Sequence, residues 1–278
     1  DKDKMEAKAM DSHFKEYFHE FSEDSPTGCV HKLIALHEDS TIQWEEISKI
    51  APALPKAWYE LSRLKPEDRI EFTKEYWQQK LMYHPNLGEF VDKFFSNLDE
   101  IGVFLIQKKF EDPFEVFLVY SVANDSGFYR GALPAPEDDL LTMESEFPEI
   151  IFPPDYLAFL KIHNGFFKTT DCTGLVLASE VKEVYDRFQV LFANEQGLVT
   201  ESGQPLDPKK LIPFYVSFGM PYYHCFWAEW YPQQEMGVVY VRGTEKTVSD
   251  ITRAENLMEG LAFPTFTDWL MFYLERIG

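Results

Sequence analysis

The sequence has few cysteines and no long hydrophobic run. Cys29, Cys172 and Cys225 are odd in number and widely scattered, without a C-x-x-C pair, so neither a disulfide framework nor a zinc knuckle is indicated. No stretch approaches the roughly 18 apolar residues of a membrane span, and the N-terminus lacks the apolar run of a signal peptide. We therefore expect a cytoplasmic protein with reduced thiols. Because Asp1–Lys4 precede Met5, we expect these first residues to be an expression remnant.

Basic residues are also scarce. The chain has 26 Lys and Arg against 47 Asp and Glu, which gives a formal net charge of −21. A charge of this sign repels the phosphates of nucleic acids and of anionic membranes. We expect neither nucleic acid nor membrane as a partner, whereas a basic protein surface, a cation or plain solubility is compatible with the charge.

Familiar catalytic motifs are missing. The chain contains no G-x-G-x-x-G, no G-x-x-x-x-G-K-[ST], no H-E-x-x-H and no G-x-S-x-G, so no loop that cradles phosphate or presents a nucleophile is recognisable. The seven histidines include no pair at the i, i+4 spacing that places two imidazoles on one helical face. The sequence therefore predicts no cofactor, no metal site and no catalytic residue.

Two histidines leave alternatives open. His163 falls on the apolar side of a predicted helix beside Asn164-Gly165, where it is either a packed ring bonded to a local carbonyl or the catalytic base of an uncharacterised hydrolase. His224 precedes Cys225 in a predicted strand, where adjacent side chains point to opposite faces. We therefore expect Cys225 to be buried and inert.

Apolar and aromatic residues, in contrast, are plentiful. With 278 residues, 45% hydrophobic and 16% aromatic, the chain can bury a sizeable core without metals or cross-links. The predicted fold class is α+β. Residues 1–135 form a mostly helical region that ends in a β-hairpin, and residues 136–278 form an α+β domain with an antiparallel or mixed sheet packed by helices. An alternative, in which the hairpin joins that sheet to give one integrated unit, stays open.

The first region has helical spacing of apolar residues from Asp11 to Leu81, and its period changes at residue 101. Helices are predicted at 11–21, from Thr41 to Pro52, at 58–64, from Pro66 to Leu81 and at 87–98, followed by a hairpin of strands 101–110 and 115–122. The acidic, proline-containing run 133–149 is the predicted linker, although Leu140, Leu141 and Met143 allow a docked segment.

In the second region the predicted elements alternate more clearly. Helices are predicted from Tyr156 to His163, from a Ser179 cap to Phe192 and from a Thr265 cap to Ile277, with antiparallel strands at 211–218, 222–230 and 236–242. The aromatic run 222–231 is either a sheet buried under helices or a platform for a partner, and alternation prevents all its aromatic rings from facing inward.

The segment FPPDYLAFLKIHNG, residues 152–165, resembles the signature of the SUKH superfamily, in which P-x-x-[YF]-x-x-[FL]-L is followed by Asn-Gly. The matching residues are Pro153, Tyr156, Phe159, Leu160, Asn164 and Gly165. The order of later elements is also similar to the family, over roughly the last half of the chain. Phe166 replaces a usual second Gly, and Phe218–Tyr222 replaces a Gly- and Asp-rich loop.

The resemblance implies a domain that binds other proteins, as an immunity-like protein or a regulatory scaffold, and it carries over no cofactor or catalytic residue. Our leading hypothesis is therefore non-enzymatic binding of a protein partner through an acidic surface, which favours a basic partner. The candidate binding residues are Glu137, Asp138, Asp139, Tyr222, Tyr223, Trp227 and Trp230. The alternatives are a hydrolase with its site near His163 and a structural or assembly subunit. The oligomeric state is left open.

Overall fold

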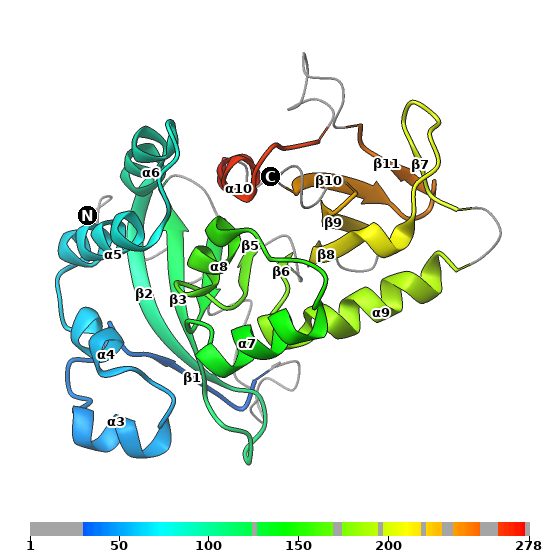
Figure 1. The fold of residues 1–278 in the computed structure, drawn as a ribbon. Helices are drawn as coiled ribbons and strands as arrows, with labels where there is room; N and C mark the ends of the chain where they lie inside the picture. Colours follow the sequence, from blue (N-terminus) through cyan, green and yellow to red (C-terminus); the bar gives the residue numbers. More distant parts are fainter. Residues whose placement is uncertain are drawn as a thin grey trace. The chain divides into compact units, whose positions relative to one another are not determined.

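The fold is described from a computed structural model, drawn as a ribbon in Figure 1. The chain divides into two compact units. Unit 1 comprises residues 1–78 and 91–133, and unit 2 comprises residues 79–90 and 134–278. The described residues are 30–123, 127–168, 174–193, 197–217, 221–229, 236–250 and 261–275. The helix predicted at 11–21 therefore lies outside them. The fold class is α+β, as predicted.

Unit 1 contains an antiparallel sheet with strand order β1-β2-β3-β4. The strands are β1 (Lys32–Ala35), β2 (Leu98–Gln107), β3 (Glu115–Val122) and β4 (Phe128–Ala132). The predicted hairpin is confirmed as β2 and β3, which pair from Leu98↔Val122 to Ile106↔Glu115. The purely helical prediction for 11–81 was wrong at β1, because pairing with β2 holds these few residues extended.

Between β1 and β2 the chain forms four described helices (Figure 1). Their residue ranges lie close to the predicted ones. They are α3 (Trp44–Ile50), α4 (Lys56–Ser62), α5 (Pro66–Lys80) and α6 (Leu87–Ser96). Proline is favourable at the first position of α5, because the amide hydrogen that it lacks would have no partner within the helix there. Glu67 and Asp68 in the first turn place negative charge at the positive end of the helix dipole. The residues between α5 and α6, with the adjoining helix ends, group with unit 2.

An aromatic cluster forms the core of unit 1. Trp77 is 1% exposed, stacks on Phe94 with ring centroids 5.7 Å apart, and donates from Nε1 to the Tyr120 hydroxyl over 3.1 Å. One charged side chain is also buried there: Arg69, which is 4% exposed, donates to the carbonyls of Leu64 and Ile101 and pairs with Glu100. Helix α5 is thereby tied to β2 by both packing and directed bonds.

Residues 133–149 are not a linker, and this prediction was wrong. They form helix α7 (Glu137–Glu146), in which Leu140 is 4% and Met143 0% exposed. Three carboxylates in the first turn suit the positive end of the helix dipole, and a proline precedes the helix. The acidic, proline-containing run therefore begins a helix that packs against the rest of the domain through Leu140 and Met143. This is the alternative to a linker that those apolar residues allowed.

Unit 2 contains a mixed sheet with strand order β5-β6-β8-β9-β10-β11-β7, in which β11 and β7 are the parallel pair. The strands are β5 (Phe166–Lys168), β6 (Gly174–Leu175), β7 (Val199–Thr200), β8 (Leu211–Val216), β9 (Tyr222–Trp227), β10 (Gly237–Arg242) and β11 (Thr247–Val248). The predicted antiparallel strands are confirmed as β8, β9 and β10.

Helices cover both faces of this sheet (Figure 1). Helix α9 (Val181–Leu191) contributes Phe188 to a buried cluster that contains Cys225 and Val239 on one face. Helices α8 (Pro154–Leu160) and α10 (Phe266–Leu274) pack against the other face. Thr265 caps α10, as predicted, since its hydroxyl oxygen accepts a bond from the Asp268 amide.

The predicted Ser179 cap was wrong. Residues 178–180 form a 3₁₀ turn, and Glu180 precedes α9 without a side-chain capping bond. The Ala178 amide at the start of this turn instead donates to Asn164 Oδ1 over 2.8 Å. A distant side chain therefore satisfies an amide at the start of the turn that leads into α9, whereas α9 itself has no side-chain cap.

Candidate functional site

The signature segment forms the centre of unit 2. Pro153 precedes α8 and Pro154 occupies its first position, while Tyr156, Phe159 and Leu160 each have 0% exposure. The Tyr156 ring lies 4.9 Å from Phe226 of β9, between centroids. Burial raises the pKa of the Tyr156 phenol well above its ordinary value. These side chains pack the core and are inaccessible to a ligand.

Asp155, which sequence analysis did not single out, joins the two helices on this face. Its Oδ2 accepts bonds from the amide and hydroxyl of Thr267, at 2.9 and 3.0 Å, in the first turn of α10. Its Oδ1 accepts a bond from the Tyr156 amide at 3.0 Å. In the sequence, Asp155 is visible only as an acidic residue in the first turn of α8, where it compensates the helix dipole. Its position in the sequence does not show that it also binds α10.

The Asn164-Gly165 pair connects α8 to the rest of the unit. Gly165 has φ of +104°, and a β-carbon there would lie 3.1 Å from Leu177 Cδ2, so glycine avoids both strain and crowding. Helix α8 ends at Leu160, three residues earlier than predicted, so His163 follows the helix. Gly165 thus permits the turn by which the chain leaves α8, and Asn164 holds the turn that begins at Ala178.

His163 has no exposed surface. Its ring centroid lies 5.5 Å from Phe166 and 6.5 Å from Phe159. The ring is thus one member of an aromatic core, and it lines neither the hollow beside α7 nor the groove beside α3. A hydrolase that used His163 as base would need the surrounding rings to move apart first.

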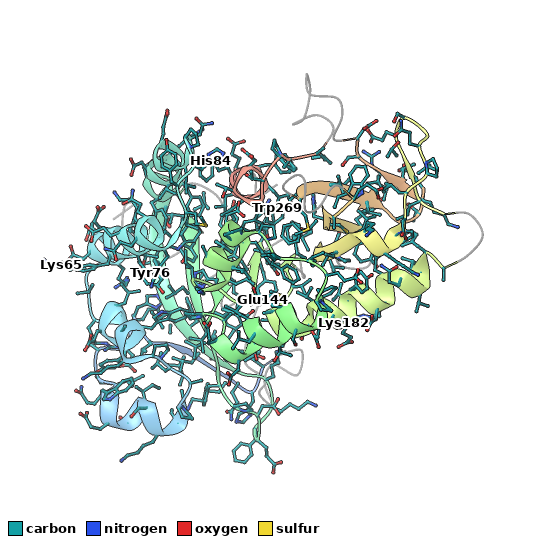
Figure 2. All side chains as sticks on the ribbon, viewed as in Figure 1. Lys65, Tyr76, His84, Glu144, Lys182 and Trp269 are labelled. Atoms are coloured by element: carbon teal, nitrogen blue, oxygen red, sulfur yellow. The ribbon has the colours of Figure 1, made fainter. Side chains whose placement is uncertain are left out.

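His224 is a second imidazole packed among aromatic rings in unit 2, and the residue as a whole is partly buried. Its ring lies 5.0 Å from Tyr215, 5.0 Å from Tyr240 and 5.6 Å from Trp269, which is labelled in Figure 2. Burial, with a smaller contribution from the charge of Lys168, lowers the pKa of His224 to about 3. The imidazole is therefore neutral at physiological pH.

Cys225 points to the opposite face of β9 and is fully buried, which places it away from the His224 ring as the alternation of strand side chains requires. Burial raises the pKa of this thiol well above its ordinary value. We expect Cys225 to resist iodoacetamide in native buffer and to react only after unfolding, because the thiolate is the reactive species. Mass spectrometry of a Cys29→Ser/Cys172→Ser variant, with and without urea, measures this, and labelling of the native protein at the rate of a free thiol would contradict it.

The aromatic residues of β9 do not form one platform. Tyr223 and Trp227 lie on the α9 face, where Trp227 is 6% exposed and Tyr223 is partly buried. Tyr222 lies on the other face, partly exposed, with its ring 5.8 Å from Tyr240. Trp230 lies outside the described residues. Of the predicted aromatic set, Tyr222 and Tyr223 retain accessible surface for a partner.

The acidic candidates do lie together at the surface. Glu137 and Asp138 are exposed and Asp139 is partly exposed in the first turn of α7, whose opposite side is anchored by Leu140 and Met143. In the described part of the chain, none of these three carboxylates forms an ion pair. The turn therefore presents unneutralised negative charge on a fixed helix.

A hollow of about 360 Å³ lies at the other end of α7. Glu146 and Glu149 line it together with Lys182, which is labelled in Figure 2 on α9, and with Lys209 and Lys210. Its Lys182 is already paired with Asp186 over 2.6 Å. Because both acidic and basic side chains line the hollow, its charges favour neither an anionic nor a cationic ligand.

The described ranges offer neither a cluster of metal ligands nor a membrane-spanning helix. No group of three or more His, Cys, Asp or Glu residues there is arranged to hold a metal ion. Among the helices of the same ranges, none combines the length and apolar character needed to cross a membrane.

Taken together, the buried signature helix, the mixed sheet and the helices on both of its faces define an α+β domain built around a folding signature. Residues 134–271 match the model of the SMI1 / KNR4 family (SUKH-1). The C-terminal half of the chain therefore belongs to the SUKH superfamily, which confirms the resemblance of residues 152–165. A comparison with curated proteins found no match.

Proposed function

We propose that this SUKH-1 domain is a non-enzymatic, cytoplasmic protein-binding module, immunity-like or regulatory, that docks a basic region of a partner protein. The observation that carries the proposal is the first turn of α7, where Glu137, Asp138 and Asp139 present unpaired charge at the surface of the family domain. The net charge of −21 strengthens the long-range attraction to a basic partner. Tyr222 and Tyr223 are additional candidates for contact.

The buried signature supports the same proposal. The family residues of α8 are enclosed in the core and serve folding, so the binding surface must come from residues on the outside of the domain. The free, buried thiol of Cys225 suits a reducing compartment such as the cytoplasm.

Charge reversal at α7 tests the proposal. We expect Glu137→Lys/Asp138→Lys to weaken capture of the partner from native cytosol by about tenfold, and we expect capture by the wild type to fall steeply with added salt. Quantitative mass spectrometry of affinity-captured proteins measures both effects.

Glu67→Lys/Asp68→Lys is a matched control, because it reverses two exposed carboxylates in the first turn of α5 at the same cost to a helix dipole. This control should leave capture unchanged. Equal capture by the α7 variant and the wild type at low salt would refute docking through this turn.

A further inference from the structure

A groove of about 1010 Å³ crosses the surface of unit 1, outside the SUKH-1 domain. Its walls are strand β1, the loop of residues 38–42 and helix α3. The aliphatic side chains along it are Leu33, Ile34, Ala35, Ile42, Ile47 and Ile50. Ile47 is fully buried at its base, whereas Ile50 is 49% exposed. An accessible apolar strip of this kind is typical of a recognition surface.

The loop that forms one wall is held firmly in place. Arg63 of α4 donates to the carbonyl oxygens of Leu36 and Asp39, and the Tyr59 hydroxyl donates to the Ile42 carbonyl over 3.1 Å. The Asp39 carboxylate itself accepts bonds from the amide and hydroxyl of Thr41. The groove therefore exists before any ligand arrives, which lowers the entropic cost of binding.

Charge at the rim identifies the complementary ligand. Glu38, Asp39 and Glu46 line the groove against a single basic residue, Lys32. Asp39 and Glu46 are exposed, and Glu46 forms no ion pair within the described ranges. The bonds from Thr41 are the main reason why the pKa of Asp39 is lowered, so this carboxylate is ionised at physiological pH. An apolar floor with a negative rim complements a segment whose aliphatic side chains are flanked by Lys or Arg.

From this geometry we propose that the groove is a docking site for a basic, amphipathic segment of a partner protein. The proposal concerns unit 1 and is independent of the function proposed for α7. Two other occupants are disfavoured by charge. Residues 1–29 carry eight Asp or Glu and four Lys, a net charge of −4, and a second copy would bring like-charged rims together on chains of charge −21.

Fluorescence anisotropy with the full chain tests the proposal. The probes are labelled peptides of about 12 residues built from Leu and Lys, one with alternating and one with helical spacing, and matched peptides with Glu in place of Lys. We expect at least one Lys peptide to bind about tenfold more tightly than its Glu counterpart. If neither Lys peptide shows this preference, the proposal is overturned.

Two pairs of variants locate the binding. Ile50→Arg should weaken the preferred peptide about tenfold, whereas Val190→Arg, at an aliphatic residue that is 76% exposed in unit 2, should not. Glu46→Lys should also weaken it, whereas Glu67→Lys, at a first-turn carboxylate of another helix, should not. Equal effects within either pair would mean nonspecific attraction and would overturn the proposal. Circular dichroism verifies that each variant is folded.

The remaining occupants give distinct results. If residues of the N-terminal segment fill the groove, Phe14→Ser/Phe18→Ser in the full chain should tighten peptide binding about tenfold, which would overturn the proposal. If a second copy fills it, sedimentation should show a dimer that Ile50→Arg dissociates, with the same consequence. A monomer whose peptide affinity is unchanged by Phe14→Ser/Phe18→Ser supports the partner segment.

Discussion

Replacing Arg69 with alanine should lower the free energy of unfolding of unit 1 by about 3–5 kcal/mol, because it breaks a buried ion pair by removing one partner. The Arg69 side chain is 5% exposed and that of Glu100 is 24% exposed, so water compensates little for the lost contacts. The change also removes donors from the carbonyl oxygens of Leu64 and Ile101, to which the guanidinium reaches over 2.6 and 2.7 Å.

Urea denaturation followed by circular dichroism measures this loss, and two variants calibrate it. Arg69→Lys keeps the charge without the planar fork of donors and should lose an intermediate amount of stability. Arg187→Ala removes an arginine that is 69% exposed and pairs with Glu183, so it should cost less than about 1 kcal/mol. If Arg69→Ala is as stable as Arg187→Ala, the buried network has no stabilising role.

Acidification should weaken unit 2 through His224. Its pKa is lowered to about 3 by burial and then by Lys168, whereas the ordinary value is 6.5. Below pH 6.5 the unfolded chain therefore takes up a proton that the folded chain refuses, and stability falls as pH falls until about pH 3. The slope approaches about 1.4 kcal/mol per pH unit, so about 2–3 kcal/mol should be lost between pH 6.5 and 4.5.

His224→Phe separates this effect from the titration of carboxylates. Phenylalanine preserves ring contacts with Tyr215, Tyr240 and Trp269 but binds no proton. The difference in unfolding free energy between variant and wild type should therefore move in favour of the variant as pH falls. Denaturant titrations at several pH values measure it. A difference that stays constant from pH 7 to pH 4.5 would show that His224 does not titrate as its burial requires.

Local signals explain why several helices could be predicted. Pro66 with two following carboxylates marks the start of α5, and Thr265 followed by Asp268 marks the start of α10. These features act within one helical turn, so the sequence displays them directly. Similarly, the β2–β3 hairpin follows from two strand-like runs around Asp112-Pro113.

Features that depend on distant partners were missed. The extended conformation of β1 depends on β2, which lies more than 60 residues away, and the Ala178 turn depends on Asn164. Helix α7 is held to the domain by Leu140 and Met143, and these side chains are buried only because other parts of the domain cover them. No pattern within these short segments reveals such partners.

The candidate site shows the same division. Exposure of Glu137 and Asp138 follows from their charge, whereas burial of Trp227 depends on α9. Alternation correctly indicated that the aromatic residues of β9 divide between two faces, but it could not show which face each helix covers. The apolar groove of unit 1 combines β1 with α3, and because β1 was not predicted, the groove was not either.

The bonds between Asp155 and Thr267 join residues that are 112 positions apart. At a synthesis rate of about 5–20 residues per second, a ribosome needs about 6–22 s to reach Thr267 after it has incorporated Asp155. During that interval the nascent helix α8 has none of the α10 side chains that later cover Tyr156 and Phe159. The signature that identifies the domain is therefore also a stretch of newly made chain that a chaperone can bind before folding is complete.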